Sequence, residues 1–291
     1  MTKPHQYRGR FAPSPTGPLH FGSLVTALAS YLEAKSRNGQ WLVRIEDLDP
    51  LREPPEATGQ ILNSLDAHGL FPDEPVLFQS RRHAAYQAAT EQLLSKGFAY
   101  RCSCSRKQLE AHNGRHPLHC REGGSKNVNQ PFAIRFALKN EICHWQDQLL
   151  GPQTQVVRAE IDDPVIVRKE GFFAYQLAVE VDDIEQGITD VVRGSDLLDM
   201  TAQQIQVYRA LGAKPPRWLH IPVIVNEQGQ KLSKQNHAPA LNNLTPVKNL
   251  CSALVALNQQ PPGFLQHGSV DDLLQWGCTH WNRRAVHLTS R

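Results

Sequence analysis

The sequence predicts an α/β protein built on a parallel sheet, with an insertion in its middle and a small helical segment at its C-terminal end. Strand and helix patterns alternate up to about residue 96, and such alternation is typical of parallel strand pairing. The alternation breaks between residues 97 and 162 and then resumes. The 291 residues, 40% hydrophobic and 20% charged, are enough for one large globular domain or two modest ones.

The first half of the sheet is predicted from apolar spacing. Leu24, Leu28 and Leu32 recur every fourth residue, which places them on one stripe of a helix. The run from Trp41 to Ile45 is typical of a buried strand and is followed directly by Glu46. We expect strands over 7–11 and 41–45, and helices over 23–37, 56–68 and 83–96.

The second half follows the insertion. We expect extended segments over 165–168, 173–179, 188–193 and 219–225, a helix over 201–211, and short helices in the tail. These patterns divide the chain into four parts: 1–97 is the first half of the core, 98–162 the insertion, 163–225 the second half of the core, and 226–291 a lysine-containing loop with a helical segment.

Composition excludes some classes of protein. The net charge of +3 is too small to indicate a nucleic-acid partner by itself. No apolar run reaches the roughly 18 residues of a membrane span, and the N-terminus has no apolar signal segment. We therefore expect a cytoplasmic protein without a membrane partner, and we expect a monomer.

Three of the six cysteines are close together in the insertion, which in a reducing compartment favours a metal over disulfides. Cys102 and Cys104 would point to one side of an extended strand. His116 lies four residues before Cys120, so one helical turn would bring both to the same face. We predict a structural zinc site of Cys102, Cys104, His116 and Cys120, with His119 as the alternative fourth ligand and free loop thiols as the alternative interpretation.

The segment from Arg10 to Ser23 joins the first predicted strand to the first helix. Its prolines and glycines turn the chain sharply and place His20 and Gly22 at the helix N-terminus. Backbone N–H groups and the helix dipole attract anions there, and Gly22 lets a nucleotide approach the backbone closely. A proline-rich loop with a solvent-facing histidine is the alternative.

This segment resembles the HIGH signature of class I aminoacyl-tRNA synthetases in its glutamyl-type form. The partner KMSKS motif of that family appears as Lys231-Leu232-Ser233-Lys234-Gln235, after the last predicted strand. Two motifs in this order around an interrupted α/β core are more specific than either alone. The resemblance implies a Rossmann-like catalytic domain whose two halves are separated by an insertion.

The resemblance also implies that the protein makes an aminoacyl-adenylate from ATP, with Mg²⁺ accompanying the nucleotide. Both reactants are anions, so catalysis requires charge neutralisation and alignment. His20 would hydrogen-bond phosphate oxygens, and Gly22 would lie against the nucleotide. Lys234, with Lys231 nearby, would stabilise the triphosphate as pyrophosphate leaves.

A glutamate substrate needs a cationic partner, for which the forked guanidinium of arginine is suited. Arg10 and Arg193 lie at the ends of predicted strands, Glu46 can accept the substrate ammonium, and Tyr175 can wall the pocket. Singly, each is also typical of a surface ion pair or a core tyrosine. The resemblance implies a glutamate site of Arg10, Phe11, Ala12, Pro13, Ser14, Glu46, Tyr175 and Arg193. Glutamine would leave a buried arginine without its counter-charge, at a cost of roughly 1–3 kcal/mol, which favours glutamate.

Only 57 residues, 235–291, follow Lys234, too few for the anticodon-binding domain of a complete glutamyl-tRNA synthetase. Over nearly its whole length the chain therefore resembles the truncated glutamyl-Q tRNA(Asp) synthetases. That family activates glutamate without tRNA and transfers it to queuosine in the anticodon of tRNA(Asp). Its zinc site has a tyrosine where this chain has His116. The alternatives are a conventional glutamyl-tRNA synthetase core, a small-molecule nucleotidyltransferase, and a binding protein with a disused site.

Overall fold

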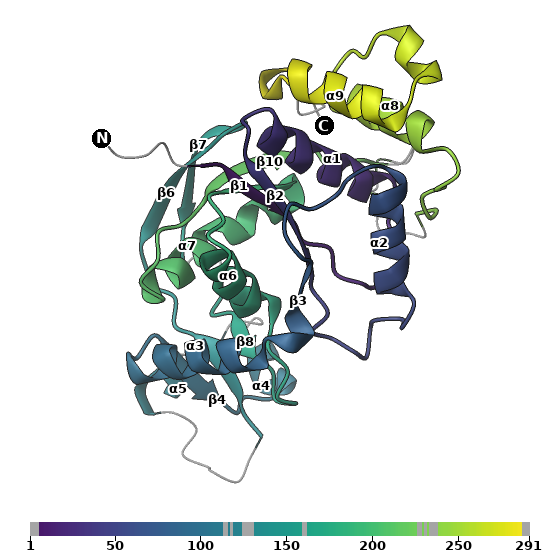
Figure 1. Ribbon diagram of the computed structural model, residues 1–291. Helices are drawn as coiled ribbons and strands as arrows, with labels where there is room; N and C mark the ends of the chain where they lie inside the picture. Colours follow the sequence, from purple (N-terminus) through teal and green to yellow (C-terminus); the bar gives the residue numbers. More distant parts are fainter. Residues whose placement is uncertain are drawn as a thin grey trace.

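Strands β1 (Arg8–Phe11), β2 (Gln40–Ile45) and β3 (Leu77–Phe78) pair in parallel, in that order, in the computed structural model. The structure describes residues 6–112, 116, 119–123, 131–158, 162–225, 229, 232 and 238–286. A second sheet has the order β7 (Gly151–Val156), β6 (Ile142–Asp147), β10 (Arg217–Ile221) and β9 (Asp190–Gly194). The Thr189 N–H donates to the Arg8 carbonyl oxygen at 2.9 Å, so β9 begins beside β1. Figure 1 shows β1 and β2 side by side, with α1 (Phe21–Lys35) next to them. The predicted α/β class with a parallel sheet is confirmed.

In this second sheet, β9 (Asp190–Gly194) and β10 (Arg217–Ile221) are parallel. β6 (Ile142–Asp147) is parallel to β10 and forms an antiparallel hairpin with β7 (Gly151–Val156). The hairpin lies within the range 98–162, yet it extends the sheet of the core. A separate antiparallel sheet, β4-β5-β8, comprises β4 (Ala99–Cys102), β5 (Ala133–Phe136) and β8 (Val165–Val167).

The helices connect and cover these sheets. They are α1 (Phe21–Lys35), α2 (Ala57–Ala67), α3 (His83–Ser95), α4 (Arg106–Glu110), α5 (His119–Gly123), α6 (Tyr175–Glu185), α7 (Thr201–Ala210), α8 (Pro246–Ala256) and α9 (Val270–His280). Short 3₁₀ helices span Gln79–Arg81, Ser195–Met200, Gly263–His267 and Arg283–Ala285. Within the described residues, the structure contains no helix of sufficient length and apolarity to cross a membrane.

The extended segment predicted over 173–179 is wrong, because α6 begins at Tyr175. The apolar residues of this segment fit both the two-residue period of a strand and the 3.6-residue period of a helix. In the structure, Leu177, Ala178 and Val181 are buried together, at the one- and four-residue spacings of one helix face. Phe173, in an isolated bridge with Val167, and the N-cap residue Ala174 remain extended. The strand predicted over 219–225 ends earlier, at Ile221, and Pro222 follows it.

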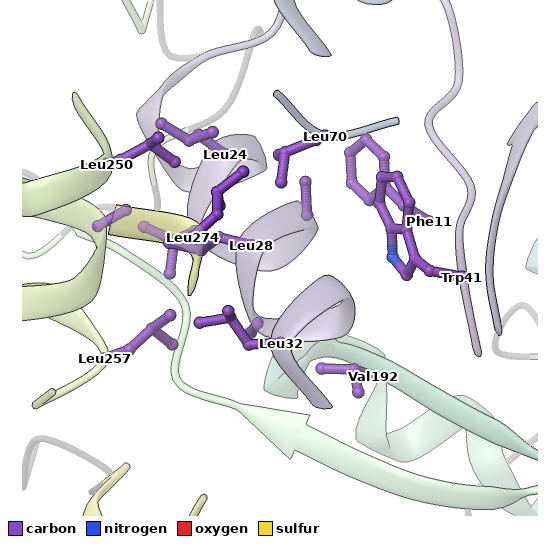
Figure 2. Close-up of a cluster of buried hydrophobic side chains, with 14 of the residues drawn as sticks. Phe11, Leu24, Leu28, Leu32, Trp41, Leu70, Val192, Leu250, Leu257 and Leu274 are labelled. Atoms are coloured by element: carbon purple, nitrogen blue, oxygen red, sulfur yellow. The ribbon is translucent and has the colours of Figure 1, made fainter. Parts of the chain in front are cut away.

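Helix α1 is buried on two sides. Figure 2 shows Leu24, Leu28 and Leu32 facing leucines of the C-terminal segment, while Phe11 and Trp41 lie on the sheet side. Because α1 packs against the C-terminal segment on one side and the sheet on the other, it carries the apolar spacing from which the sequence predicts a helix. The buried Glu33 accepts hydrogen bonds from Trp281 and Arg283, which fixes the end of the chain to α1.

Alternation along the strands separates two cores. Trp41, Val43 and Ile45 belong to the core under α1, whereas Leu42 belongs to the core under α6 and α7. Side chains two residues apart on a strand point to the same face, so Arg44, Arg193 and His220 share the α6–α7 face with Leu42, Val191 and Trp218. Arg10 points to the same face, because the adjacent Phe11 belongs to the core under α1. One face of the sheet therefore carries a polar group of buried side chains.

Candidate active site

A cavity of about 590 Å³ lies where β1, β2, β9 and β10 end. Ligands of open α/β sheets bind at this edge. Its lining includes Arg10, Phe11, Ala12, Pro13, Ser14, His20, Gly22, Glu46, Tyr175 and Arg193. Lys231 and Lys234 lie outside the described residues, but Leu232 between them also lines the cavity. The structure thus brings together the described residues of both predicted substrate sites.

His20 caps the N-terminus of α1, where the sequence predicts it. Its Nδ1 accepts the Ser23 N–H at 3.2 Å, so the proton of the neutral ring is on Nε2. A Cβ on Gly22 would lie 3.2 Å from the His20 ring, so glycine leaves room for this side-chain position. The cap therefore selects the tautomer that can donate a hydrogen bond from Nε2 to an anion.

Arg193 is nearly fully buried, and uncharged groups accept its hydrogen bonds. Its Nη1 donates to Gln204 at 2.6 Å and its Nη2 to the Thr201 hydroxyl at 2.9 Å, while its Nε faces His220. Burial lowers the pKa of Arg193 and raises that of the neighbouring Glu180 well above its ordinary value. This shift favours the uncharged form of Glu180, which competes with an anionic substrate group for the charge of Arg193 less than a carboxylate would.

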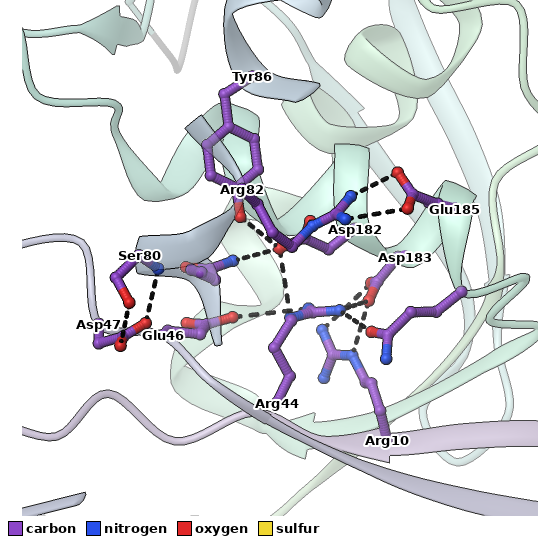
Figure 3. Close-up of polar contacts among 12 residues, drawn as sticks. Arg10, Arg44, Glu46, Asp47, Ser80, Arg82, Tyr86, Asp182, Asp183 and Glu185 are labelled. Carbon is purple, nitrogen blue, oxygen red and sulfur yellow. Dashed lines mark hydrogen bonds and ion pairs between the residues drawn. The ribbon is translucent and has the colours of Figure 1, made fainter. Parts of the chain in front are cut away.

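Arg10 has a different environment, since Asp183 of α6 neutralises its charge. Its Nε and Nη2 donate to the two oxygens of Asp183, at 3.2 and 3.3 Å. Arg44, with no exposed surface, donates to the same carboxylate at 2.8 Å. Burial opposes the charge of Asp183, but the two guanidinium groups lower its pKa (Figure 3). Asp183 therefore fixes Arg10 against α6.

Glu46 directly follows β2 and is 7% exposed. Burial raises its pKa to about 7, although Arg44 and Arg10 act in the opposite direction. Its Oε1 lies 3.6 Å from Arg44 Nη2 and, among the described residues, has no hydrogen-bond partner. An acceptor buried in this way suits a charged donor from a ligand, such as an ammonium group.

Asp182, which precedes Asp183 on α6, connects α6 to α3 and to the 3₁₀ helix before α3. It accepts hydrogen bonds from Gln79 at 2.7 Å, Arg82 at 2.6 Å and Tyr86 at 2.8 Å (Figure 3). Sequence reasoning missed Arg44, Asp182, Asp183, His220 and Asp147. Two adjacent acids within an apolar run were the available signal, but their role depends on recognising α6 as a helix.

The predicted metal ligands also come together. One ligand atom each from Cys102, Cys104, His116 and Cys120 lies within 4.8 Å of the others, and all four residues are buried. The Sγ atoms of Cys104 and Cys120 are 3.6 Å apart, close to the edge of about 3.8 Å expected for tetrahedral zinc thiolates. His119 is exposed, with its Nε2 3.9 Å from Cys104 Sγ. This geometry favours His116 as the fourth ligand, and the donor set fits zinc.

Tyr100 orients His116. Its hydroxyl donates to Asp163 at 2.6 Å and lies 3.0 Å from His116 Nδ1. Because that hydroxyl proton points to Asp163, its oxygen accepts the Nδ1–H of His116. His116 Nε2, 3.1 Å from Cys102 Sγ, is then left with the lone pair that a metal requires.

Comparisons with known proteins agree with this architecture. Residues 6–250 match the family of tRNA synthetases class I (E and Q), catalytic domain. The chain is 48% identical over 280 residues to a glutamyl-Q tRNA(Asp) synthetase of Pseudomonas aeruginosa, covering 96% of this chain and 95% of that relative. It is 47% identical over 281 residues to one of Photobacterium profundum, covering 97% and 90%.

A solved structure extends the comparison. The glutamate-tRNA synthetase from Elizabethkingia anophelis is similar with a TM-score of 0.82 at 27% identity, covering 97% of this chain and 67% of that one. This chain therefore spans about two thirds of that protein. The curated relatives match it over nearly their whole length. The chain belongs to the glutamyl-Q tRNA(Asp) synthetases, which are ligases within the class I (E and Q) tRNA synthetases.

Proposed function

We propose that this protein activates L-glutamate as glutamyl-adenylate without needing tRNA, and then transfers the glutamate to queuosine at the wobble position of tRNA(Asp). We place this reaction in the cytoplasm and assign it to a monomer. The observation that carries the activation step is the continuous cavity lined both by His20 and Gly22 at the α1 N-terminus and by Arg193 and Glu46. An anion site and an amino-acid site in one cavity suit a reaction between ATP and an amino acid.

In the first step, an oxygen of the glutamate α-carboxylate attacks the α-phosphorus of ATP, and the bond to pyrophosphate breaks. Arg193 binds the side-chain carboxylate and Glu46 the ammonium, which holds the attacking group in place. His20 Nε2–H donates to a phosphate oxygen, and Lys234, with Lys231, stabilises the leaving pyrophosphate. Mg²⁺ bound with ATP supplies further neutralisation of the phosphate charge.

In the second step, a hydroxyl of queuosine attacks the activated carbonyl, an ester forms and AMP leaves. The names of the curated relatives support this acceptor, since they are glutamyl-Q tRNA(Asp) synthetases. The alternative is transfer to the 3′ end of tRNA(Glu), as in a conventional glutamyl-tRNA synthetase. A small-molecule nucleotidyltransferase is less favoured, because it requires neither Arg193 nor Glu46.

The experiment incubates the protein with ATP, isotopically labelled glutamate and total bacterial tRNA, followed by nuclease digestion and mass measurement of the fragments. We expect one glutamyl group on the anticodon fragment of tRNA(Asp). The matched control is tRNA from cells that cannot make queuosine, which should remain unlabelled. Label on the 3′-terminal fragment of tRNA(Glu) would instead establish the alternative.

A further inference from the structure

A buried chain of hydrogen bonds runs from the β6–β7 hairpin to Arg193. Asp147, the last residue of β6, has its Oδ2 2.6 Å from Nδ1 of His220 on β10. Nε2 of His220 is 2.9 Å from Nε of Arg193 on β9. The exposed fractions of the three residues are 1%, 0% and 4%. Of the three, only Arg193 also lines the substrate cavity.

The direction of each hydrogen bond follows from the groups involved. A guanidinium only donates, so His220 Nε2 must accept the Arg193 Nε–H. The proton of the neutral imidazole is therefore on Nδ1, which donates to Asp147 Oδ2. Asp147 Oδ1 in turn accepts the N–H groups of Leu149 and Leu150, each at 2.9 Å. The turn of the hairpin thus holds the Asp147 carboxylate in place, and this carboxylate orients the His220 ring.

This chain accounts for the orientation of Arg193. His220 takes the Nε–H, while Gln204 and Thr201 take one N–H from each terminal nitrogen. Because these acceptors are uncharged, they orient the guanidinium without neutralising it. A carboxylate in place of His220 would orient Arg193 equally well but would compete with an anionic substrate for its charge.

We propose that His220 and Asp147 are positioning residues for glutamate recognition: Asp147 fixes the Nδ1–H tautomer of His220, whose Nε2 then holds Arg193 in the orientation that binds the substrate carboxylate. This inference rests on the proposed glutamate site. It gives part of the range 98–162 a role in amino-acid binding, because Asp147 reaches the core from that range.

The test is Asp147→Asn, which keeps the shape of the side chain but changes its hydrogen bonding. Leu149 and Leu150 hold the remaining oxygen, so the new amide NH₂ faces His220 Nδ1. His220 must then carry its proton on Nε2, directly opposite the Arg193 Nε–H. We expect the KM for glutamate in ATP–pyrophosphate exchange to rise roughly tenfold or more, with kcat and the KM for ATP changed by less than about threefold.

A second substitution provides rescue. His220→Gln places an amide oxygen near the position of Nε2, and this acceptor does not depend on a tautomer. The double variant Asp147→Asn/His220→Gln should therefore have a lower KM for glutamate than Asp147→Asn alone. A merely structural role predicts no rescue of KM, because two core changes destabilise more than one and the double variant would only contain less folded protein. Partial unfolding lowers kcat through loss of active protein and leaves KM unchanged.

The matched control is Asp271→Asn, the same change on an exposed residue of α9, which should leave both KM values unaltered. An unchanged KM for glutamate in Asp147→Asn, or a double variant no better than the single one, overturns the positioning role while glutamate-dependent exchange by the unaltered protein remains. Absence of glutamate-dependent exchange in the unaltered protein overturns the proposed function, and this inference with it.

Discussion

The two arginines of the candidate glutamate site differ in how their charges are compensated. Asp183 neutralises Arg10 and also contacts Arg44, whereas the described hydrogen bonds of Arg193 go to uncharged acceptors. A substrate carboxylate gains most from a positive charge that is already desolvated and oriented. We therefore assign selection of glutamate over glutamine to Arg193 and a scaffolding contribution to Arg10.

Glu46 should couple stability to pH. With an ordinary pKa of 4.5 when unfolded and about 7 when folded, its proton is held more tightly in the native protein. Its contribution to stability is complete below pH 4.5 and is lost as the pH rises to about 7. Glu46→Gln should thus unfold like the unaltered protein near pH 4 and be more stable by up to about 3 kcal/mol at pH 8. Urea titrations at both pH values measure this difference.

The same variant should bind glutamate less well, because an amide attracts the substrate ammonium less strongly than a carboxylate does. A substitution that raises the stability of the protein but lowers its affinity for the substrate is expected at a residue whose role is in binding rather than in folding. Glu185→Gln, on the exposed side of α6, is the matched control and should show neither effect above about 1 kcal/mol. Equal stability of Glu46→Gln and the unaltered protein at pH 8 would contradict the raised pKa.

Lys234→Ala should slow glutamate-dependent ATP–pyrophosphate exchange by roughly 10²–10³-fold, because charge develops on pyrophosphate in the transition state. Glutamate affinity, measured by calorimetry, should change little, since Arg193 and Glu46 bind that substrate. Lys248→Ala, on an exposed position of α8, provides the control. Near-normal exchange by Lys234→Ala would remove this lysine from the proposed role.

At the scale of elements, α6 connects the candidate amino-acid site to the rest of the core. Tyr175 at its first turn lines the cavity, and Asp182 and Asp183 lie on the face that meets the strands. Its two acids bring together β1, β2 and α3. Arg44 can be buried near the end of β2 because Asp183 and Asp182 of α6, together with Glu46, supply opposing charge.

Asp183→Asn should destabilise the protein by about 3–5 kcal/mol, because Arg10 and Arg44 would both lose a buried carboxylate. Thermal and urea unfolding at pH 7 measure the loss. Glu185→Gln, on the same helix and partly exposed, should cost no more than about 1 kcal/mol. Similar losses from the two substitutions would mean that the buried network contributes no more than a surface pair.

The sequence predicted the residues that line the cavity better than those that support them. Motifs place His20 at a helix start and Glu46 at a strand end, because turn chemistry and apolar runs are local properties. Asp183 meets Arg10 across 173 positions, and His220 meets Asp147 across 73. Such partners depend on strand order, which local periodicity does not encode, and the first residues of α6, 175–179, were themselves predicted as extended.

At the scale of the whole molecule, the range 98–162 has two structural parts. The β6–β7 hairpin extends the core sheet and holds Asp147, whereas β4 and β5 form a separate sheet with β8 and carry Cys102. None of the four candidate zinc ligands is among the described residues that line the cavity. We infer that the hairpin supports the proposed amino-acid site, and we expect the zinc-fitting part, whose four candidate ligands lie outside the cavity lining, to contact tRNA.

Cys120→Ser should therefore separate the two steps of the proposed reaction. Loss of one ligand should reduce bound zinc from roughly one per chain and weaken the transfer of glutamate to tRNA by about tenfold or more. Glutamate-dependent ATP–pyrophosphate exchange should stay within about threefold of normal, since the cavity keeps its lining. Metal analysis, exchange and transfer assays on one preparation measure all three, with Cys278→Ser on α9 as the matched control. Equal loss of exchange and transfer would show that the zinc-fitting part supports the catalytic core rather than the contact with tRNA.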